Sequence, residues 1–179
     1  TEAIASIAQP IHIDASPYDI SWVATTPFAE DGEHGGEGYR AEHARRIFRS
    51  WVAIYGNLFY LRSGFTGMVA EPALQWHHLD LSLRLYSGES APEEPEYGGR
   101  EVFSAGFSLG DVDTPEPYFY AWIYPLTSGD EAEELRPSGS YWKKPNASAI
   151  LLYRTVAPRD DWRDSLAYFF DSAFRAETR

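Results

Sequence analysis

Residues 75–88 read QWHHLDLSLRLYSG, and the second half of this stretch alternates apolar and polar side chains. Because neighbouring side chains of a β-strand point to opposite faces, residues 79–86 are predicted to form a strand with one apolar face and one polar face. The apolar face would carry Leu79, Leu81, Leu83 and Leu85, and the other face Asp80, Ser82, Arg84 and Tyr86. A strand that is buried on one side only is typical of an antiparallel sheet.

The segments around this strand predict a single α+β domain over residues 1–179. Apolar residues at three- and four-residue steps predict a helix within 39–65 and a C-terminal helix over 160–177. The apolar stripe of the first helix would comprise Ala44, Ile47, Phe48, Trp51, Tyr55, Leu58 and Phe59, and that of the last helix Trp162, Leu166, Phe169, Phe170 and Phe174. Further strands are predicted at 101–110, at 118–125 and in a closing pair at 140–144 and 149–156. The strand at 118–125 is aromatic on both faces, so we expect it to be central and covered on each side. The predicted strands follow one another in the sequence, with one helix before them and one after. This order favours a mostly antiparallel sheet with the two helices packed on it.

The composition narrows the class of protein. The net charge is −12, from 27 acidic and 15 basic residues, so we expect neither nucleic acid nor an anionic membrane surface as a partner. The absence of cysteine excludes disulfides, thiolate nucleophiles and cysteine-bound metals. The chain contains no apolar run of about 20 residues and no signal-peptide pattern, which leads us to expect a cytoplasmic protein. It begins at Thr1 rather than at methionine, as it would if an upstream segment had been removed.

Several motifs occur in one order along residues 27–179. They are PFAEDGEH at 27–34, GFTG at 64–67, QWHHLDLSLRLYSG at 75–88, EVFSAGFSLGD at 101–111, PEPYFYAWIYP at 115–125 and RPSGSYW at 136–142, followed by the aromatic C-terminal helix. In these motifs the chain resembles a bacterial family of unknown function, DUF5996. Longer members of that family carry an additional N-terminal half, which this chain is expected to lack.

The resemblance implies a few functional positions but no reaction, because the activity of the family is not established. Asp80 matches an aspartate of the shared pattern, and His34, close to Asp31, matches a shared histidine. His77 and His78 stand where many members have small residues after a tryptophan. The resemblance therefore points to Asp31, His34 and Asp80 rather than to the histidine doublet.

Strand geometry separates the two histidines of the doublet. If the strand pattern extends backwards, His78 lies on the polar face with Asp80, and His77 lies on the leucine face. His78 and Asp80 could then serve as two metal ligands, or as a base with its orienting carboxylate. The alternative is an ordinary polar pair on a solvated face.

The acidic loop before the first helix is the second candidate. Asp31 and His34 lie in EDGEHGGE and offer hard oxygen ligands and one imidazole, which suit a divalent Mn, Fe or Zn ion. The loop lacks calcium-loop spacing, and a charged loop of this kind also commonly faces water. A divalent metal and its identity therefore remain open.

Arg84 and several aromatic residues are candidates for contacts with a substrate. Arg84 could orient a carboxylate through two parallel hydrogen bonds, and Trp76, Tyr120 and Tyr141 lie in or next to predicted strands, whose ends commonly border pockets. The alternatives are core aromatic residues and a surface ion pair between Arg84 and Asp80.

Two classes of function remain. The first is a small-molecule site on the polar face of the sheet, binding or enzymatic, with Asp80, His78 and His34 in acid–base or metal-assisted roles; it requires Asp31 or His34 to lie near Asp80. The second is a non-catalytic interaction domain, for instance a homodimer. Ser104 and Ser108 lack the G-x-S-x-G context of a nucleophile, and the glycines at 35, 36 and 38 lack the lysine and hydroxyl of a phosphate-binding loop, so we expect no nucleotide cofactor.

Overall fold

The computed structural model describes residues 40–75, 79–91, 97–125, 134–144 and 147–177. The chain divides into two compact units, Thr1–His43 and Ala44–Arg179. The whole sheet belongs to the second unit, which is the one described below. The prediction of a single domain over 1–179 stays a prediction, whereas the α+β class is confirmed.

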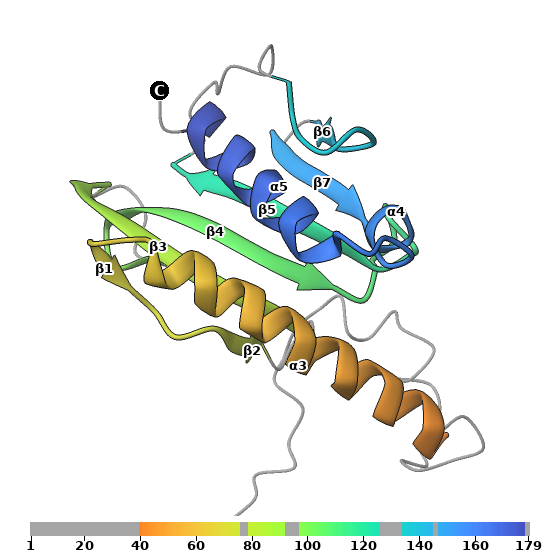
Figure 1. Ribbon diagram of the computed structural model, residues 1–179. Helices are drawn as coiled ribbons and strands as arrows, with labels where there is room; N and C mark the ends of the chain where they lie inside the picture. The colour runs from red at the N-terminus through yellow and green to blue at the C-terminus, as the bar shows by residue number, and fades with distance from the viewer. Residues whose placement is uncertain (1–39, 76–78, 92–96, 126–133, 145–146, 178–179) are drawn as a thin grey trace, which may run out of the picture. The chain divides into compact units, whose positions relative to one another are not determined.

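A seven-stranded, antiparallel sheet forms the centre of the second unit (Figure 1). Its strands are β1 (Met68–Val69), β2 (Ala73–Gln75), β3 (Asp80–Ser90), β4 (Arg100–Ser108), β5 (Tyr118–Tyr124), β6 (Tyr141–Lys143) and β7 (Ser148–Leu152). The spatial order is β1-β3-β4-β5-β7-β6, and β2 pairs with β3 beside β1. The predicted strands and the pairing of β6 with β7 are thus confirmed, but the strand predicted over 149–156 ends at Leu152, and Tyr153–Val156 form the short helix α4 instead.

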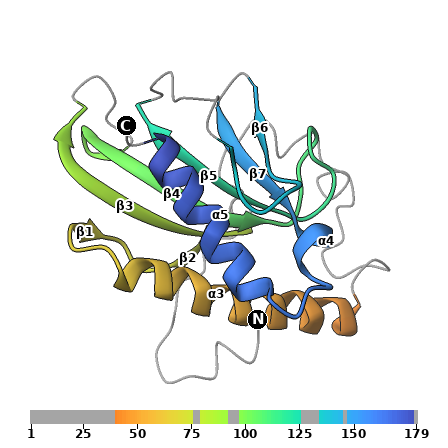
Figure 2. The ribbon, with the colours of Figure 1, turned by 45° about the horizontal axis from the view of Figure 1, so that its top comes forward.

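The helices lie on one face of this sheet (Figures 1 and 2). They are α3 (Ala41–Ser63), the short α4 (Tyr153–Val156) and α5 (Trp162–Glu177). Inward-facing side chains of alternate strand positions pack against them, and Leu83, Ala105, Ala121 and Leu151 are fully buried there. The helices contribute Ile54, Leu58, Leu166, Phe169 and Phe170 to the same core. Burial of this apolar face is the main stabilising contribution to the fold, because each large apolar side chain contributes about 1.5–3 kcal/mol.

The predicted strand starts one residue too early. Leu79 has a positive φ of 55° and is 47% exposed, so it is a turn residue and does not belong to the apolar face. Its N–H donates a hydrogen bond to the carbonyl oxygen of Gln75, which closes the connection between β2 and β3. Strand alternation therefore holds only from Asp80 onward, and it provides no basis for assigning His78 to a face.

The predicted apolar stripe of the first helix is partly wrong. The helix α3 continues through Gly56 and Asn57 as far as Ser63, and its buried residues are Ile54 and Leu58. The predicted stripe members Phe48, Tyr55 and Phe59 are 63%, 40% and 45% exposed. Two apolar stripes lie side by side on this helix, and only one of them can face the sheet.

Gly106 in the middle of β4 allows an aromatic ring to cross the polar face of the sheet. A Cβ atom at this position would lie 2.5 Å from Cζ and Oη of Tyr120 and 2.7 Å from the carbonyl oxygen of Leu81. Gly106 pairs with Ser82 of β3 and with Tyr120 of β5, so the Tyr120 ring lies over the strand between these two. No other residue type leaves room for the ring there.

We expect Gly106→Ala to destabilise the protein by about 1–3 kcal/mol, because the added methyl group meets both a buried ring and backbone. The free energy of unfolding, measured in denaturant, checks this. Gly56→Ala is the matched control: nothing lies within 4 Å of its Cβ position, and alanine in a helix is favoured by about 1 kcal/mol. Equal stability of Gly106→Ala and the unchanged protein would contradict the crossing of the ring.

Candidate functional site

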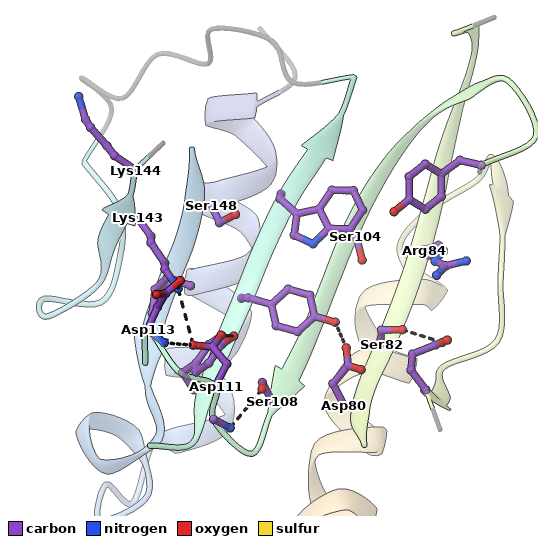
Figure 3. Close-up of a pocket in the computed structure, with 17 residues that line it drawn as sticks. Asp80, Ser82, Arg84, Ser104, Ser108, Asp111, Asp113, Lys143, Lys144 and Ser148 are labelled. Carbon is purple, nitrogen blue, oxygen red and sulfur yellow. Dashed lines mark hydrogen bonds and ion pairs between the residues drawn. The ribbon is translucent and has the colours of Figure 1, made fainter. Parts of the chain in front are cut away.

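The polar face of the sheet is hollowed into a cavity of about 480 Å³ (Figure 3). Its wall comprises Gln75, Asp80, Ser82, Arg84, Tyr97, Ser104, Ser108, Gly110, Asp111, Asp113, Tyr118, Tyr120, Trp122, Lys143, Lys144, Ser148 and Ile150. Side chains of β3, β4, β5 and β7 form the floor, and segments that follow β3 and β4 contribute Tyr97 and Asp111. The volume is within the range of small-molecule sites.

The strand register arranges the floor in rows. Arg84, Ser104 and Trp122 lie opposite one another on β3, β4 and β5 and form one row. The next row runs from Ser82 across Gly106 and Tyr120 to Ile150 of β7. All of these positions share one face, because residues opposite each other in a sheet point to the same side.

Tyr120 and Asp80 form the hydrogen bond that spans the floor. The Tyr120 hydroxyl donates to Oδ2 of Asp80 over 2.5 Å, and the second oxygen of Asp80 is buried without a partner. Burial, together with the nearby Asp80 carboxyl group, raises the pKa of Tyr120 well above its usual range. Tyr120 therefore acts as a fixed hydrogen-bond donor and is unsuited to be a base at neutral pH.

Arg84 lies at one end of the cavity, and no acidic side chain among the described residues pairs with it. Its guanidinium group stacks over the Tyr97 ring at 5.3 Å from the centroid, and its Nε is buried without a hydrogen bond. Among the described residues, no ion pair joins Arg84 to a carboxylate, so the alternative of an Arg84–Asp80 surface pair is wrong. The two side chains are four residues apart on one strand face, and each has a different partner.

A cluster around Asp111 forms the other end. Asp111 accepts hydrogen bonds from the Tyr118 hydroxyl at 2.6 Å and from the N–H groups of Thr114 and Asp113 at 2.6 Å and 2.8 Å. The Lys143 ammonium lies 3.4 Å from Asp113 and 3.8 Å from Asp111, and Figure 3 shows these groups together. Partial burial acts to raise the pKa of Asp111, but the hydrogen bonds and Lys143 outweigh it and hold the pKa below its ordinary value. Burial and Asp111 together raise the pKa of Tyr118.

The structure brings three of the predicted site residues to this cavity. Asp80, Arg84 and Tyr120 all line it. Tyr141 lies opposite Ile150 on β6 but is 41% exposed and is not part of the cavity wall. Trp76, His77, His78, Asp31 and His34 lie outside the described residues, so the proximity of Asp31 or His34 to Asp80 stays a prediction.

The expectation that β5 is covered on each side is half right. Phe119, Ala121 and Ile123 face the helices, whereas Tyr118, Tyr120 and Trp122 line the cavity.

Among the described residues, no group of three or more acidic, histidine or cysteine side chains could hold a metal ion. In the same part of the chain, no helix is long and apolar enough to cross a membrane.

Sequence reasoning missed Asp111, Lys143 and Tyr97. A signal was present for the lysine: Lys143 and Lys144 are the only lysines among 179 residues, and both line the cavity. Asp111 follows directly on the strand pattern of β4 in FSLGD, where a side chain can fold back over the sheet. Tyr97 lies in an irregular, glycine-flanked stretch that carries no periodic signal.

A family model described as a family of unknown function, DUF5996, matches residues 1–179. The chain belongs to this family. The match includes residues 1–26, beyond the motifs that first indicated the resemblance. Neither the curated proteins nor the solved structures contain a match to this member of DUF5996.

We expect Tyr118→Phe to raise the pKa of Asp111, because the substitution removes a hydrogen bond to the carboxylate. The folded pKa is depressed, so the stabilisation from Asp111 is present above its ordinary value of 3.8 and is lost as the pH falls through the folded value. A carboxyl-carbon NMR titration measures the shift directly. Tyr168→Phe, at an exposed tyrosine of α5, is the control; an unchanged Asp111 titration in Tyr118→Phe would contradict the cluster.

Proposed function

We propose that this member of DUF5996 binds a small molecule on the polar face of its sheet. The observation that carries the proposal is Arg84, which has no acidic partner among the described residues and lies at one end of a cavity of about 480 Å³. A guanidinium group without a carboxylate partner keeps its terminal amino groups available as hydrogen-bond donors to a ligand. The buried Nε is not one of these donors, because it has no surface open to the cavity.

The lining of the cavity supports the same proposal. Four aromatic side chains, Tyr97, Tyr118, Tyr120 and Trp122, stand beside serine hydroxyls and carboxylates. Small-molecule sites commonly combine an aromatic wall with a few fixed polar groups that set the orientation of the ligand. Here the polar groups are held in place by the Tyr120–Asp80 and Tyr118–Asp111 hydrogen bonds.

The described groups favour binding over acid–base catalysis. Both cavity tyrosines have raised pKa values, and Asp111 is committed to three hydrogen bonds. An acid–base or metal-binding role for Asp80 would require His78 or His34 as its partner, and this role remains a prediction. A base within hydrogen-bond reach of a substrate proton is the first requirement of such chemistry.

Native mass spectrometry of the untagged protein, purified without chelator, tests the proposal. We expect a non-covalent small-molecule adduct that is lost in Ser148→Trp, because Ser148 lines the cavity and the larger side chain would fill it. Ser90→Trp is the matched control, since Ser90 is exposed at the end of β3 and does not line the cavity. An adduct that persists in Ser148→Trp would place the ligand elsewhere, and a bare mass in the unchanged protein would count against a resident ligand.

A second candidate function is self-association through the outer stripe of α3. This stripe comprises Phe48, Val52, Tyr55 and Phe59, all exposed at spacings of four, three and four residues. A contiguous exposed apolar stripe commonly marks a protein-interaction surface, and a second copy of the chain is the partner we consider.

Light scattering at several concentrations tests this candidate. We expect the unchanged protein to be dimeric and Val52→Glu to be monomeric, because a buried charge in such an interface is costly. Tyr168→Glu on α5 is the control at another exposed apolar residue. A monomeric mass of the unchanged protein at all concentrations would rule out self-association.

A further inference from the structure

We propose that the ligand carries a single carboxylate attached directly to a flat ring, with the carboxylate on Arg84 and the ring against Trp122. This inference rests on the proposed function and names the class of molecule that the cavity selects. It follows from three features of the cavity: the lack of an acidic partner for Arg84 among the described residues, the ion pairs of Lys143, and the aromatic residues around Arg84.

Arg84 is pre-organised for a planar anion. The Cζ atom of its guanidinium group lies 5.3 Å from the centroid of the Tyr97 ring, and this stacking restricts the orientation of the planar group, whose N–H donors form a fork. Its Nε is buried without a partner, and among the described residues no acidic side chain forms an ion pair with it. A carboxylate matches the fork through two parallel hydrogen bonds, which a neutral carbonyl or a cation cannot provide.

The charges of the cavity favour one negative charge over two. Lys143 lies between Asp113 and Asp111, at 3.4 Å and 3.8 Å, so its charge is already compensated. The cavity wall also contains Asp80, and the chain as a whole has a net charge of −12. A phosphate dianion would face Arg84 and three carboxylates of the wall, whereas the single charge of a carboxylate is matched by Arg84.

The residues next to Arg84 determine what carries the carboxylate. Trp122 lies in the same cross-strand row, separated from Arg84 only by the small Ser104. Tyr97 contacts both of the larger side chains, with its ring centroid 5.7 Å from that of Trp122. Aromatic rings thus lie beside the guanidinium group in the cavity wall, and they attract a flat ring more than a flexible polar chain.

Titrations of the labelled protein with small probes test this inference, followed through the indole N–H signal of Trp122. The probes are benzoate, benzamide, acetate, benzylamine and phenyl phosphate. We expect benzoate to bind about tenfold or more tightly than benzamide, because hydrogen bonds to a charged group contribute about 1.5–3 kcal/mol. Acetate, which lacks the ring, and phenyl phosphate, which carries a second charge, are each expected to bind more weakly than benzoate.

Variants connect the binding to Arg84. We expect Arg84→Gln to abolish the preference of benzoate over benzamide and Arg84→Lys to weaken benzoate binding about fivefold or more, because lysine lacks the planar fork. Arg175→Gln on α5, where Arg175 pairs with Asp171, is the control and should leave binding unchanged. The comparison of benzoate with benzamide on the unchanged protein needs no variant and holds even if Arg84→Gln folds poorly.

The outcomes distinguish this inference from the proposed function. Equal binding of benzoate and benzamide, or tighter binding of phenyl phosphate or benzylamine, overturns the carboxylate but leaves a small-molecule site. Acetate that binds as tightly as benzoate overturns the ring. No response of the Trp122 signal to any probe overturns both this inference and the proposed site.

Discussion

The hydrogen bond between Tyr120 and Asp80, made across Gly106, is the constraint on which the polar face depends. It joins β5 to β3 over the strand between them, and it is available only because a Cβ at Gly106 would lie 2.5 Å from the ring. The crossing ring forms the floor of the cavity and keeps a buried hydroxyl and a carboxyl group in fixed positions. A floor fixed in this way is pre-organised, which lowers the entropic cost of binding.

The two faces of the sheet have separate roles. The inner face buries leucine, phenylalanine and alanine side chains against α3 and α5 and supplies the stability. The polar face carries residues that contribute little to such a core: Arg84, the serines and the Asp111 cluster. Arg84 has no carboxylate partner among the described residues, and the proposed ligand would supply one. The exposed stripe of α3 belongs neither to the core nor to the cavity wall.

Local patterns in the sequence predict much of this arrangement. Alternation along β3 correctly places Asp80 and Arg84 on the polar face, and the helical spacing of α5 identifies Leu166, Phe169 and Phe170 as core. Leu79 escapes prediction because a leucine with positive φ carries no turn signal. The stripe of α3 is misassigned because two apolar stripes lie side by side on that helix and periodicity cannot choose between them.

The cavity escapes sequence reasoning for a different reason. Tyr97 and Asp111 come from irregular segments, and their contacts with Arg84 and Tyr118 depend on how these segments return over the sheet. Lys143 stands on the short edge strand β6, and only the pairing of β6 with β7 places it on the cavity face. Such contacts are tertiary, and spacing along the chain does not encode them.

A crystal structure of the protein purified without added ligand tests the central claim most directly. We expect the Tyr120 ring to lie over Gly106 and electron density for a flat acid to lie in the cavity beside Arg84 and Trp122. A cavity filled by the chain's own side chains, with Arg84 paired to one of its carboxylates, would contradict it.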